Sequence, residues 1–441
     1  MTPCFPNNLF GIAAMRIPHR PRTRAAGTLA RRAAAAPILL RERPRMNTSA
    51  SALPDFRSRE FLLGHVRDTM AFYHPRCIDP AGGFFQFFKD DGTVYDPHTR
   101  HLVSSTRFVF NYSMAWQAFG DPAYRQAVRH GIAFLRDAHR NPGTGGYAWV
   151  LHDGRVQDAT NHCYGLAFLV LAYAKALEAG MEEARGWLEE TWQLMEQRFW
   201  EPEHGLYADE ATNDWQLSPY RGQNANMHAC EAWLAALEAS GEPRYLQRAQ
   251  LLAANMTGRQ AALAGGLVWE HYRPDWSVDW DYNRDDRSNI FRPWGFQPGH
   301  QVEWAKLLLI LDRHAPDAGH LPRARELFDR AVAMAWDPRH GGLVYGNDVE
   351  GGFYDEDKYF WVQAEALATA ALLAERTGEA GYWQWYDRLW DYSWRHFVDH
   401  EHGAWYRILG PGNRKLTDEK SPAGKTDYHT MGACYEVLKV L

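Results

Sequence analysis

One short pattern recurs six times after residue 55, and it limits the folds that this chain can adopt. In each copy a polar stretch ends in Gly-Gly or His-Gly and continues into aromatic and β-branched residues, as in "AGGFFQF" and "EHGLYAD". The last glycines of these steps are Gly83, Gly146, Gly205, Gly266, Gly342 and Gly403, at intervals of 63, 59, 61, 76 and 61 residues. Intervals of this size indicate repeated structural units. We expect a short turn or strand pair at each glycine step.

Each interval has room for two helices, and the sequence supplies two kinds. Residues 162–174, "HCYGLAFLVLAYA", contain no Lys, Arg, Asp or Glu, which indicates a helix that is buried on every side. Residues 122–138 are amphipathic instead, with Tyr124, Val128 and Ile132 on one stripe, so we expect this helix to face water. The pattern therefore predicts alternating buried and amphipathic helices.

The buried helices are predicted to begin near residues 106, 161, 226, 299, 358 and 428. The sixth has no amphipathic helix after it, so we expect a helix at 57–73 to fill that place and close a ring. Six buried helices inside six amphipathic ones form an (α/α)6 barrel. We predict an all-α fold with short β turns, in which residues 46–441 form a single domain.

The first 45 residues differ in composition from this region. They contain nine arginines, no lysine and one acidic residue, Glu42, with many Ala and Pro residues. Such a composition is typical of a disordered leader, or of an upstream stretch that is read when the true start is Met46. We expect residues 1–45 to lie outside the folded domain.

Charge and cysteine content exclude several classes of function. The formal net charge of -6 offers no basic surface for nucleic acid. The sequence has no apolar run near the roughly 20 residues that a membrane span requires. Five scattered cysteines without a C-x-x-C pair favour a reduced, cytoplasmic protein. We expect a monomer or homodimer that acts on a small molecule.

Polar residues gather at the expected first turns of the buried helices. In this barrel all buried helices run the same way, so their first turns meet at one mouth. The polar residues are Arg107, Asn161, His162, Tyr164, Asn224, Asn226, His228, Glu231, His300, Glu303, Lys358, Trp361, Gln363, Glu365, Asp427 and His429. We interpret them as the lining of a shared pocket. The aromatic and charged insertion at 273–297 is expected to lie over this mouth as a lid.

Two H-x-x-E pairs, His228/Glu231 and His300/Glu303, stand among these residues. One helical turn separates the members of each pair, so the carboxylate can hydrogen-bond the imidazole and raise its basicity. His300 and His429 begin two separate buried helices that must converge, which makes them the preferred candidates for catalysis. His228 alone is as well explained as part of a buried polar network.

A metal centre competes with this interpretation, because the same spacing resembles the Glu-x-x-His half-sites of carboxylate-bridged metals. Such a centre needs further inward carboxylates, and only Glu365 and Asp427 offer themselves. Arg107 is also an unusual neighbour for a cation, although it can equally form an ion pair or bind substrate. We predict no metal, and we interpret Lys420 and Lys425 as solvated loop charges.

The same stretches resemble the N-acylglucosamine 2-epimerase family over about residues 55–441. The resemblance is carried by "STRFVFNYSMAW", "NANMHACEAWLAALE", "PGHQVEWAKLLL", "KYFWVQAEALATAALL" and "GKTDYHTMGACYEVL". It implies an (α/α)6 barrel that epimerises or isomerises a monosaccharide without a metal or other cofactor.

The resemblance also implies roles for individual residues. His300 and His429 match the two histidines that carry the family's acid/base chemistry. Sugar-binding and supporting positions match Arg107, Tyr164, Asn224, His228, Arg292, Glu303 and Trp361. We add Glu231, Gln363 and Asp427 as supporting residues because of their places at the expected mouth. We assign proton transfer between C2 and C1 to His429 and ring opening to His300, and the reverse assignment stays open.

The ending "DYHTMGACYE" is most similar to the mannose isomerase branch, which interconverts mannose and fructose through a cis-enediolate. The 2-epimerases usually end differently. The sulfoquinovose isomerase branch is an alternative, although the sequence shows no extra basic cluster for a sulfonate. A neutral imidazole with a pKa near 6.5 can remove the C2 proton of an open-chain aldose without a cofactor.

Two other classes of function stay open at this point. A glycoside hydrolase on the same barrel needs two carboxylates about 5 to 10 Å apart. A helical ring that only binds a sugar or a protein leaves the paired histidines without a task.

We predict that a chain beginning at Met46 has the melting temperature and catalytic turnover of the full-length chain, because residues 1–45 have no apolar periodicity with which to pack. Thermal unfolding and activity assays of the two chains check this. A large loss of either property on truncation contradicts it.

Overall fold

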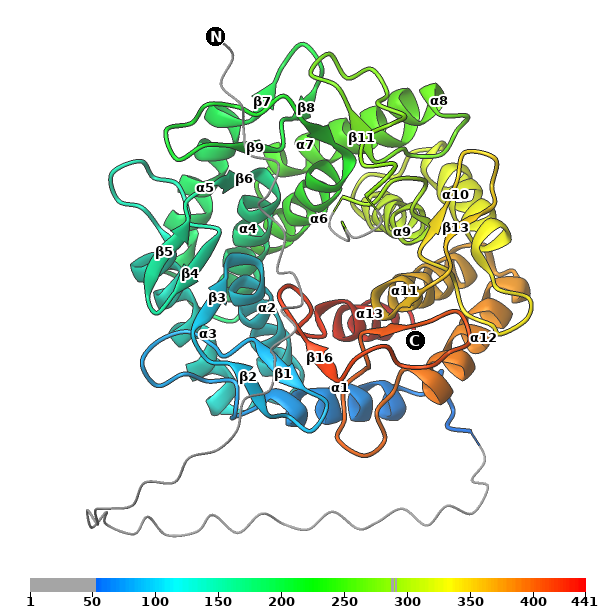
Figure 1. The fold of residues 1–441 in the computed structure, drawn as a ribbon, viewed down its shortest axis with the longest axis horizontal. Helices are drawn as coiled ribbons and strands as arrows, with labels where there is room; N and C mark the ends of the chain where they lie inside the picture. The colour runs from blue at the N-terminus through cyan, green and yellow to red at the C-terminus, as the bar shows by residue number, and fades with distance from the viewer. Residues whose placement is uncertain (1–52, 287–288, 290–291) are drawn as a thin grey trace, which may run out of the picture. The chain divides into compact units, whose positions relative to one another are not determined.

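Two concentric rings of helices make up the computed structural model, which describes residues 53–286, 289 and 292–441 (Figure 1). The inner helices are α2 (Leu102–Phe119), α4 (Cys163–Glu178), α6 (Gln223–Ser240), α9 (Pro298–His314), α11 (Phe360–Thr377) and α13 (Tyr428–Leu438). The outer helices are α1 (Arg59–Tyr73), α3 (Pro122–Phe134), α5 (Ala184–Arg198), α7 (Pro243–Ala253), α10 (His320–Ala335) and α12 (Ala380–His396). The predicted (α/α)6 barrel is confirmed.

The inner ring closes on itself. Its packing order is α2, α4, α6, α9, α11 and α13, and α13 returns to α2. Each of the first five inner helices carries on its outer side the helix that follows it in sequence. The sixth, α13, is covered by α1, so the two ends of the repeat region lie side by side (Figure 1). This closure agrees with the prediction for residues 57–73.

The two rings differ in burial as their sequences indicate. Nearly all of α4 is buried, including the run from Gly165 to Leu177. In α3 the buried residues are Ala127, Val128, Gly131 and Ile132, which form one face of the helix. An α-helix whose polar residues are confined to one face exposes that face to water.

The amphipathic segment at 122–138 is interrupted, because α3 gives way to a π-helical turn at Leu135–His139. A second such turn, Ala254–Gln260, follows α7 and leads into the short α8 (Ala261–Leu263).

Short strands connect the units at one end of the barrel. They are β1 (Phe87–Lys89), β2 (Val94–Asp96), β3 (Thr99–His101), β4 (Val150–His152), β5 (Arg155–Asp158), β6 (Asn161–His162), β7 (Trp200–Glu201), β8 (Leu206–Tyr207), β9 (Glu210–Ala211), β10 (Arg221–Gly222), β11 (His271–Tyr272), β12 (Gly346–Asn347), β13 (Phe353–Asp355), β14 (Lys358–Tyr359), β15 (Ile408–Leu409) and β16 (Glu419–Ser421). The strands that precede α2, α4, α6 and α11 each pair antiparallel with a strand of the next unit, as β3–β4, β6–β9, β10–β11 and β14–β15. These pairings tie the head of each of these inner helices to its neighbour.

The glycine steps form tight turns, as predicted. At Gly342 the backbone has φ 81°, and a Cβ atom there would lie 2.4 Å from the Tyr392 ring. At the second step the left-handed residue is Gly145 rather than Gly146. Gly146 is required for another reason, because a Cβ atom would lie 2.1 Å from Oδ1 of Asn161.

Residues 54–441 form one compact unit. The leader predicted for residues 1–45 lies outside the described residues, and so do residues 287, 288, 290 and 291 of the expected lid. Within the described ranges, every helix is too short or too polar to cross a lipid bilayer.

Candidate active site

A cavity of about 150 Å³ lies at the mouth where the inner helices begin. Eight of the predicted site residues line it, namely Arg107, Tyr164, Asn224, His228, His300, Glu303, Trp361 and His429. The other lining residues are His101, Val103, Trp149, Pro293, Tyr345, Tyr359, Phe360, Arg407, Ala423, Gly424 and Lys425. All six inner helices or the segments just before them contribute, so the barrel geometry brings together residues that are far apart in sequence.

His300 lies in the first turn of α9, and a carboxylate fixes its ring. Its Nδ1 atom lies 2.9 and 3.0 Å from the two carboxylate oxygens of Glu270. Both side chains are buried. An ionised carboxylate can only accept, so Nδ1 carries the hydrogen and Nε2 is left as an acceptor. The expected pairing of His300 with Glu303 is therefore wrong, because Glu270 occupies Nδ1.

His429 lies in the first turn of α13 and is held in the same way. Its Nδ1 atom lies 2.6 Å from Oε1 of Glu365, a residue of α11. The other oxygen of Glu365 accepts a hydrogen bond of 2.5 Å from Lys306. Burial and the nearby charge of Arg107 lower the pKa of His429 well below its ordinary value. This imidazole is therefore neutral near neutral pH, with Nε2 free to accept a proton.

The indole ring of Trp361 contacts both histidines. The centroid of Trp361 lies 5.1 Å from that of His300 and 5.7 Å from that of His429. Trp361 therefore lies beside both imidazoles and lines the cavity. A flat indole face in that place suits the apolar face of a sugar.

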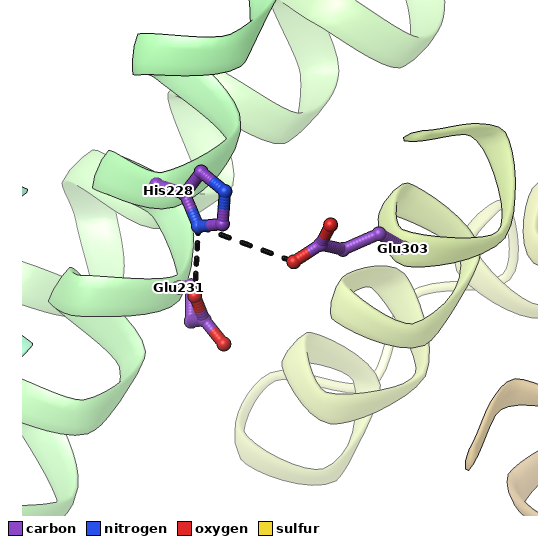
Figure 2. A group of neighbouring side chains, drawn as sticks. All are labelled: His228, Glu231 and Glu303. Atoms are coloured by element: carbon purple, nitrogen blue, oxygen red, sulfur yellow. Dashed lines mark hydrogen bonds and ion pairs between the residues drawn. The ribbon is translucent and has the colours of Figure 1, made fainter. Parts of the chain in front are cut away.

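His228 forms the predicted contact with Glu231, one turn along α6. Nδ1 of His228 lies 3.0 Å from Oε2 of Glu231 and 3.9 Å from Oε1 of Glu303, which projects from α9 (Figure 2). Burial lowers the pKa of His228, although Glu231 opposes this shift. Burial also opposes ionisation of Glu231, but the bond with His228 and the charge of Lys306 hold its pKa below the ordinary value. Glu231 lies behind His228 and does not line the cavity.

Glu303 is an unusual carboxyl group. Its side chain is 1% exposed, it lines the cavity, and neither oxygen has a hydrogen-bond partner. Burial, followed by the charge of Glu365, raises its pKa well above the ordinary value. The group therefore keeps its proton near neutral pH and can donate a hydrogen bond to a ligand in the cavity.

Two sets of ligand atoms in this cluster lie close enough together to hold a metal ion, namely His228, Glu231 and Glu303, and Glu303, Glu365 and His429. A protein cation already lies among them. Nζ of Lys306 is 2.5 Å from Glu365 and 3.9 Å from both Glu231 and Glu303. The charge of Glu365 raises the pKa of Lys306 despite its burial, so it stays protonated. The positive charge of Lys306 would repel a metal ion bound to these ligands and weaken its binding. The ligand atoms therefore fit an ammonium group better than a metal ion.

Positive charge reaches the cavity from three side chains. Arg107 donates to the Tyr164 hydroxyl at 3.1 Å and to the carbonyl of Gly424, and no carboxylate in the described part of the chain pairs with it. Lys425 is buried beside Asp427 at 2.5 Å, and burial lowers its pKa to about 8. Arg407 lines the cavity without a carboxylate partner among the described residues. The sequence did not predict Lys425 or Arg407 as lining residues.

Lys420 and Lys425 are not solvated, contrary to expectation. Both are buried, and Lys420 lies 2.5 Å from Asp399. A buried ammonium requires a nearby carboxylate, and in each case an aspartate supplies it.

Two predicted site residues have structural tasks instead. Gln363 binds the backbone of Leu343, accepting from its N–H at 3.0 Å and donating to its carbonyl at 2.8 Å. Asp427 accepts from the Tyr73 hydroxyl at 2.6 Å and from Lys425. Neither lines the cavity, but Asp427 pairs with Lys425, which does.

Gln363 belongs to a repeated arrangement. The fourth residues of α6, α9 and α11 are Asn226, Gln301 and Gln363. Each holds both backbone groups of a residue just past a glycine step, Tyr207, Val268 and Leu343 respectively. We call these three contacts the amide clamps. Part of the polarity at the helix heads therefore joins the two halves of a unit and does not line the pocket.

Arg292 is the remaining predicted site residue. Its guanidinium lies 2.6 Å from Glu210 and stacks over the Tyr220 ring at 4.0 Å. It does not line the cavity, whereas the next residue, Pro293, does. The described part of the 273–297 insertion thus reaches the mouth through Pro293.

Sequence reasoning missed Glu270 and Arg407, although the repeat contained a signal for both. Each lies four residues after the last glycine of its step. At the first two steps this position holds Phe87 and Val150. The third step has the charged Asp209 there and the fifth has Gly346, so this position is charged in three of the six repeats. A charged residue within the mainly apolar stretch after a glycine step indicates a special environment. Glu270 is the partner of His300, and Arg407 lines the cavity.

Known proteins resemble this chain over most of its length. A sequence model of the family described as N-acylglucosamine 2-epimerase (GlcNAc 2-epimerase) matches residues 83–433. A D-mannose isomerase of Marinomonas mediterranea is 57% identical over 390 residues, which are 88% of this chain and 99% of that protein.

Solved structures agree with these matches. A crystal structure of D-mannose isomerase has a TM-score of 0.87 and 57% identity, and the match covers 88% of this chain and all of that chain. A cellobiose 2-epimerase from Spirochaeta thermophila has a TM-score of 0.77 and 25% identity, with 86% and 96% covered.

The amide clamps predict a loss of stability without damage to the cavity wall. Gln363→Ala leaves the buried N–H and carbonyl of Leu343 without partners, and each such group costs about 1–3 kcal/mol. We expect the free energy of unfolding to fall by about 2–4 kcal/mol, measured by denaturant titration. The exposed Gln157→Ala serves as the control, with an expected change within about 0.5 kcal/mol. Equal stability of the two variants contradicts the clamp.

Proposed function

The chain belongs to the N-acylglucosamine 2-epimerase family, and we propose that it is a sugar isomerase that interconverts D-mannose and D-fructose. The proposal rests on the pair of buried imidazoles at one cavity. Nδ1 of each is held by a carboxylate, and Trp361 lies beside both. Two proton acceptors on one small cavity are what a reaction with two proton-transfer stages requires.

The first stage opens the sugar ring, because a closed hemiacetal has no acidic C–H bond. A proton must leave O1 and another must reach O5. His300 performs both transfers through Nε2, while Glu270 holds its Nδ1–H and stabilises the imidazolium that forms between them.

The second stage moves a proton from C2 to C1 of the open chain. Neutral His429 accepts the C2 proton at Nε2, which leaves a cis-enediolate, and returns it to C1 on the same face. Glu365 stabilises the resulting imidazolium through Nδ1–H. The low pKa of His429 makes it neutral before the transfer and a strong acid after it.

Charge that develops on the enediolate oxygens needs stabilising donors. Arg107 offers a guanidinium at the cavity wall, and Glu303 offers the proton that its raised pKa retains. The N-terminal ends of the inner helices add their partial positive charge. Such groups act strongly because they are already in place when the charge develops and need no reorganisation.

The rival classes find less support in this geometry. Glu303 is the only carboxyl group among the described residues that line the cavity, whereas a glycoside hydrolase requires two. A ring that only binds ligands does not require two imidazoles held for proton transfer.

A second substrate class is favoured by Arg407, which lines the cavity without a carboxylate partner in the described ranges. A free guanidinium there suits an aldose with an anionic group at C6, such as a sulfonate. This alternative uses the same histidines and the same proton transfers.

Product analysis tests the proposal. Mannose incubated with the protein should give fructose as the main product, with glucose minor or absent. In D₂O the fructose should carry deuterium at one C1 position to the extent that the transferred proton exchanges with solvent. Chromatography and NMR of the early mixture measure both.

Three outcomes of the same assay would contradict the mannose isomerase proposal. Glucose as the dominant early product, or fast turnover of N-acetylmannosamine, identifies a 2-epimerase. Preference for sulfoquinovose over mannose identifies the anionic substrate class. Lack of exchange at C2 with every sugar overturns the isomerase proposal.

Removal of either catalytic histidine tests their roles. His300→Ala and His429→Ala should each lower kcat by at least about 10²-fold, the usual scale of lost acid/base catalysis, with folding intact. His228→Ala should lose less, because His228 supports the cavity wall. Steady-state kinetics and circular dichroism provide the measurement. Near-normal turnover of either of the first two variants contradicts the assignment.

A further inference from the structure

Lys306 lies at the centre of a buried charge cluster directly behind the cavity. Its ammonium contacts Glu365 at 2.5 Å, and Glu231 and Glu303 lie 3.9 Å away. Lys306 and Glu365 are both buried. Lys306 does not line the sugar cavity, so its effect on a substrate must pass through its neighbours.

The cluster draws charged and titratable groups from all the helices around it. They are Arg107 on α2, Tyr164 on α4, His228 and Glu231 on α6, Glu303 on α9, Glu365 on α11, and Tyr428 and His429 on α13. Three carboxyl groups share this space with one lysine. Without a cation, like charges at such distances cannot all be ionised.

The cation determines which carboxyl group stays ionised. Glu365 makes the shortest contact with Lys306, whereas both oxygens of Glu303 lack a hydrogen-bond partner. Burial raises the pKa of Glu365, and the charge of Lys306 and its hydrogen bond oppose that shift. Loss of the ammonium would therefore favour a protonated Glu365.

The state of Glu365 decides the tautomer of His429. An ionised Glu365 can only accept, so it takes the hydrogen of Nδ1 and leaves the lone pair of Nε2 for the sugar. A protonated Glu365 would donate to Nδ1 and leave the hydrogen on Nε2. In that tautomer His429 cannot accept a proton from C2.

We propose that Lys306 is a positioning residue that keeps Glu365 ionised and thereby holds His429 in the tautomer that accepts the C2 proton. This inference rests on the isomerase proposal for its kinetic effect, but the effect on the His429 tautomer requires no substrate.

A second cavity gives access to Lys306 from the opposite end of the barrel. It measures about 60 Å³ and is lined by Lys306, Glu231, Glu365, His429, Gly432 and Lys439, among others. The Glu231 side chain is 17% exposed although it does not line the sugar cavity, so its exposed surface faces this rear cavity. The exposed Lys439 lies at its outer end. A small amine can therefore enter without passing the sugar.

The direct test is ¹⁵N NMR of histidine-labelled protein, with the His429 signals assigned from a His429→Asn variant. In the unchanged protein we expect His429 neutral with its hydrogen on Nδ1. In Lys306→Ala we expect the hydrogen on Nε2. An unchanged tautomer in the variant overturns the inference, whatever the substrate of the protein is.

Kinetics with mannose supply the second test. Lys306→Ala should lower kcat by at least about 10²-fold with little change in KM, because a wrong tautomer costs up to ~10⁴-fold in other enzymes. The acid limb of kcat/KM should move to higher pH, since loss of a positive charge raises the pKa values of Glu365 and His429. Methylammonium should restore part of kcat by filling the place of the lost ammonium. A drop in kcat without rescue and without movement of the pH profile indicates a merely structural role and overturns the inference.

Three control variants separate these effects from misfolding. Lys306→Ala/Gly432→Leu should lose the rescue, because the leucine fills the rear cavity. Gly432→Ala alone should leave activity unchanged, and added to Lys306→Ala it should leave the rescue unchanged. The reason is that a Cβ atom at Gly432 meets nothing closer than Phe110 at 4.0 Å. Lys306→Met/Glu365→Met removes one charge of each sign and leaves no acceptor for Nδ1–H of His429, so it should fold normally and remain inactive with methylammonium. Activity of this double variant contradicts the role of Glu365. Absence of mannose turnover by the unchanged protein counts against the isomerase proposal, and the NMR result then decides the inference.

Discussion

The amide clamps are the contacts on which the rest of the structure depends. Asn226, Gln301 and Gln363 each hold both backbone groups of a residue that has just left a glycine step. Those backbone groups are buried, so without the clamps they would lack partners and cost free energy. The clamps fix where three of the hairpins meet the heads of α6, α9 and α11. None of the three amides lines the cavity, so the clamps stabilise the helix heads from which the lining residues project.

Behind the cavity, charged side chains hold the catalytic imidazoles in place. Each catalytic imidazole has a carboxylate on Nδ1, but the carboxylates differ in their surroundings. Glu270 lies beside Gln223, whose amide donates to it at 3.0 Å, whereas Glu365 lies beside Lys306. The two histidines therefore have different electrostatic environments. This difference gives a physical basis for assigning them different stages of one reaction.

Sequence reasoning predicted the barrel well because periodicity reports burial directly. A segment without charged residues, such as 162–174, is best explained as an inner helix. The sixth buried helix had no amphipathic helix after it, which predicted that α1 covers it. It also placed eight lining residues at the mouth, since parallel inner helices leave no other place for their first turns.

Individual partners were harder to predict, because polarity at a helix head does not reveal what it contacts. Gln363 and Asp427 looked like pocket residues but bind backbone and neighbouring side chains. Glu270 lies outside the helices and pairs with His300 across 30 residues, so helical spacing could not reveal it. Lys425 lies in a loop, and only the folded chain brings Asp427 around to neutralise it.

The placement of α13 has one further consequence. This helix carries His429 and packs against α1, α2 and α11, so it joins segments that are separated by most of the chain. Contacts over such separations form late, since loop closure must precede them. An otherwise folded barrel with α13 undocked would still hold His300 but would lack the second imidazole. Enzymatic turnover is therefore a reporter of ring closure, whereas helical structure reports only that the separate helices have formed.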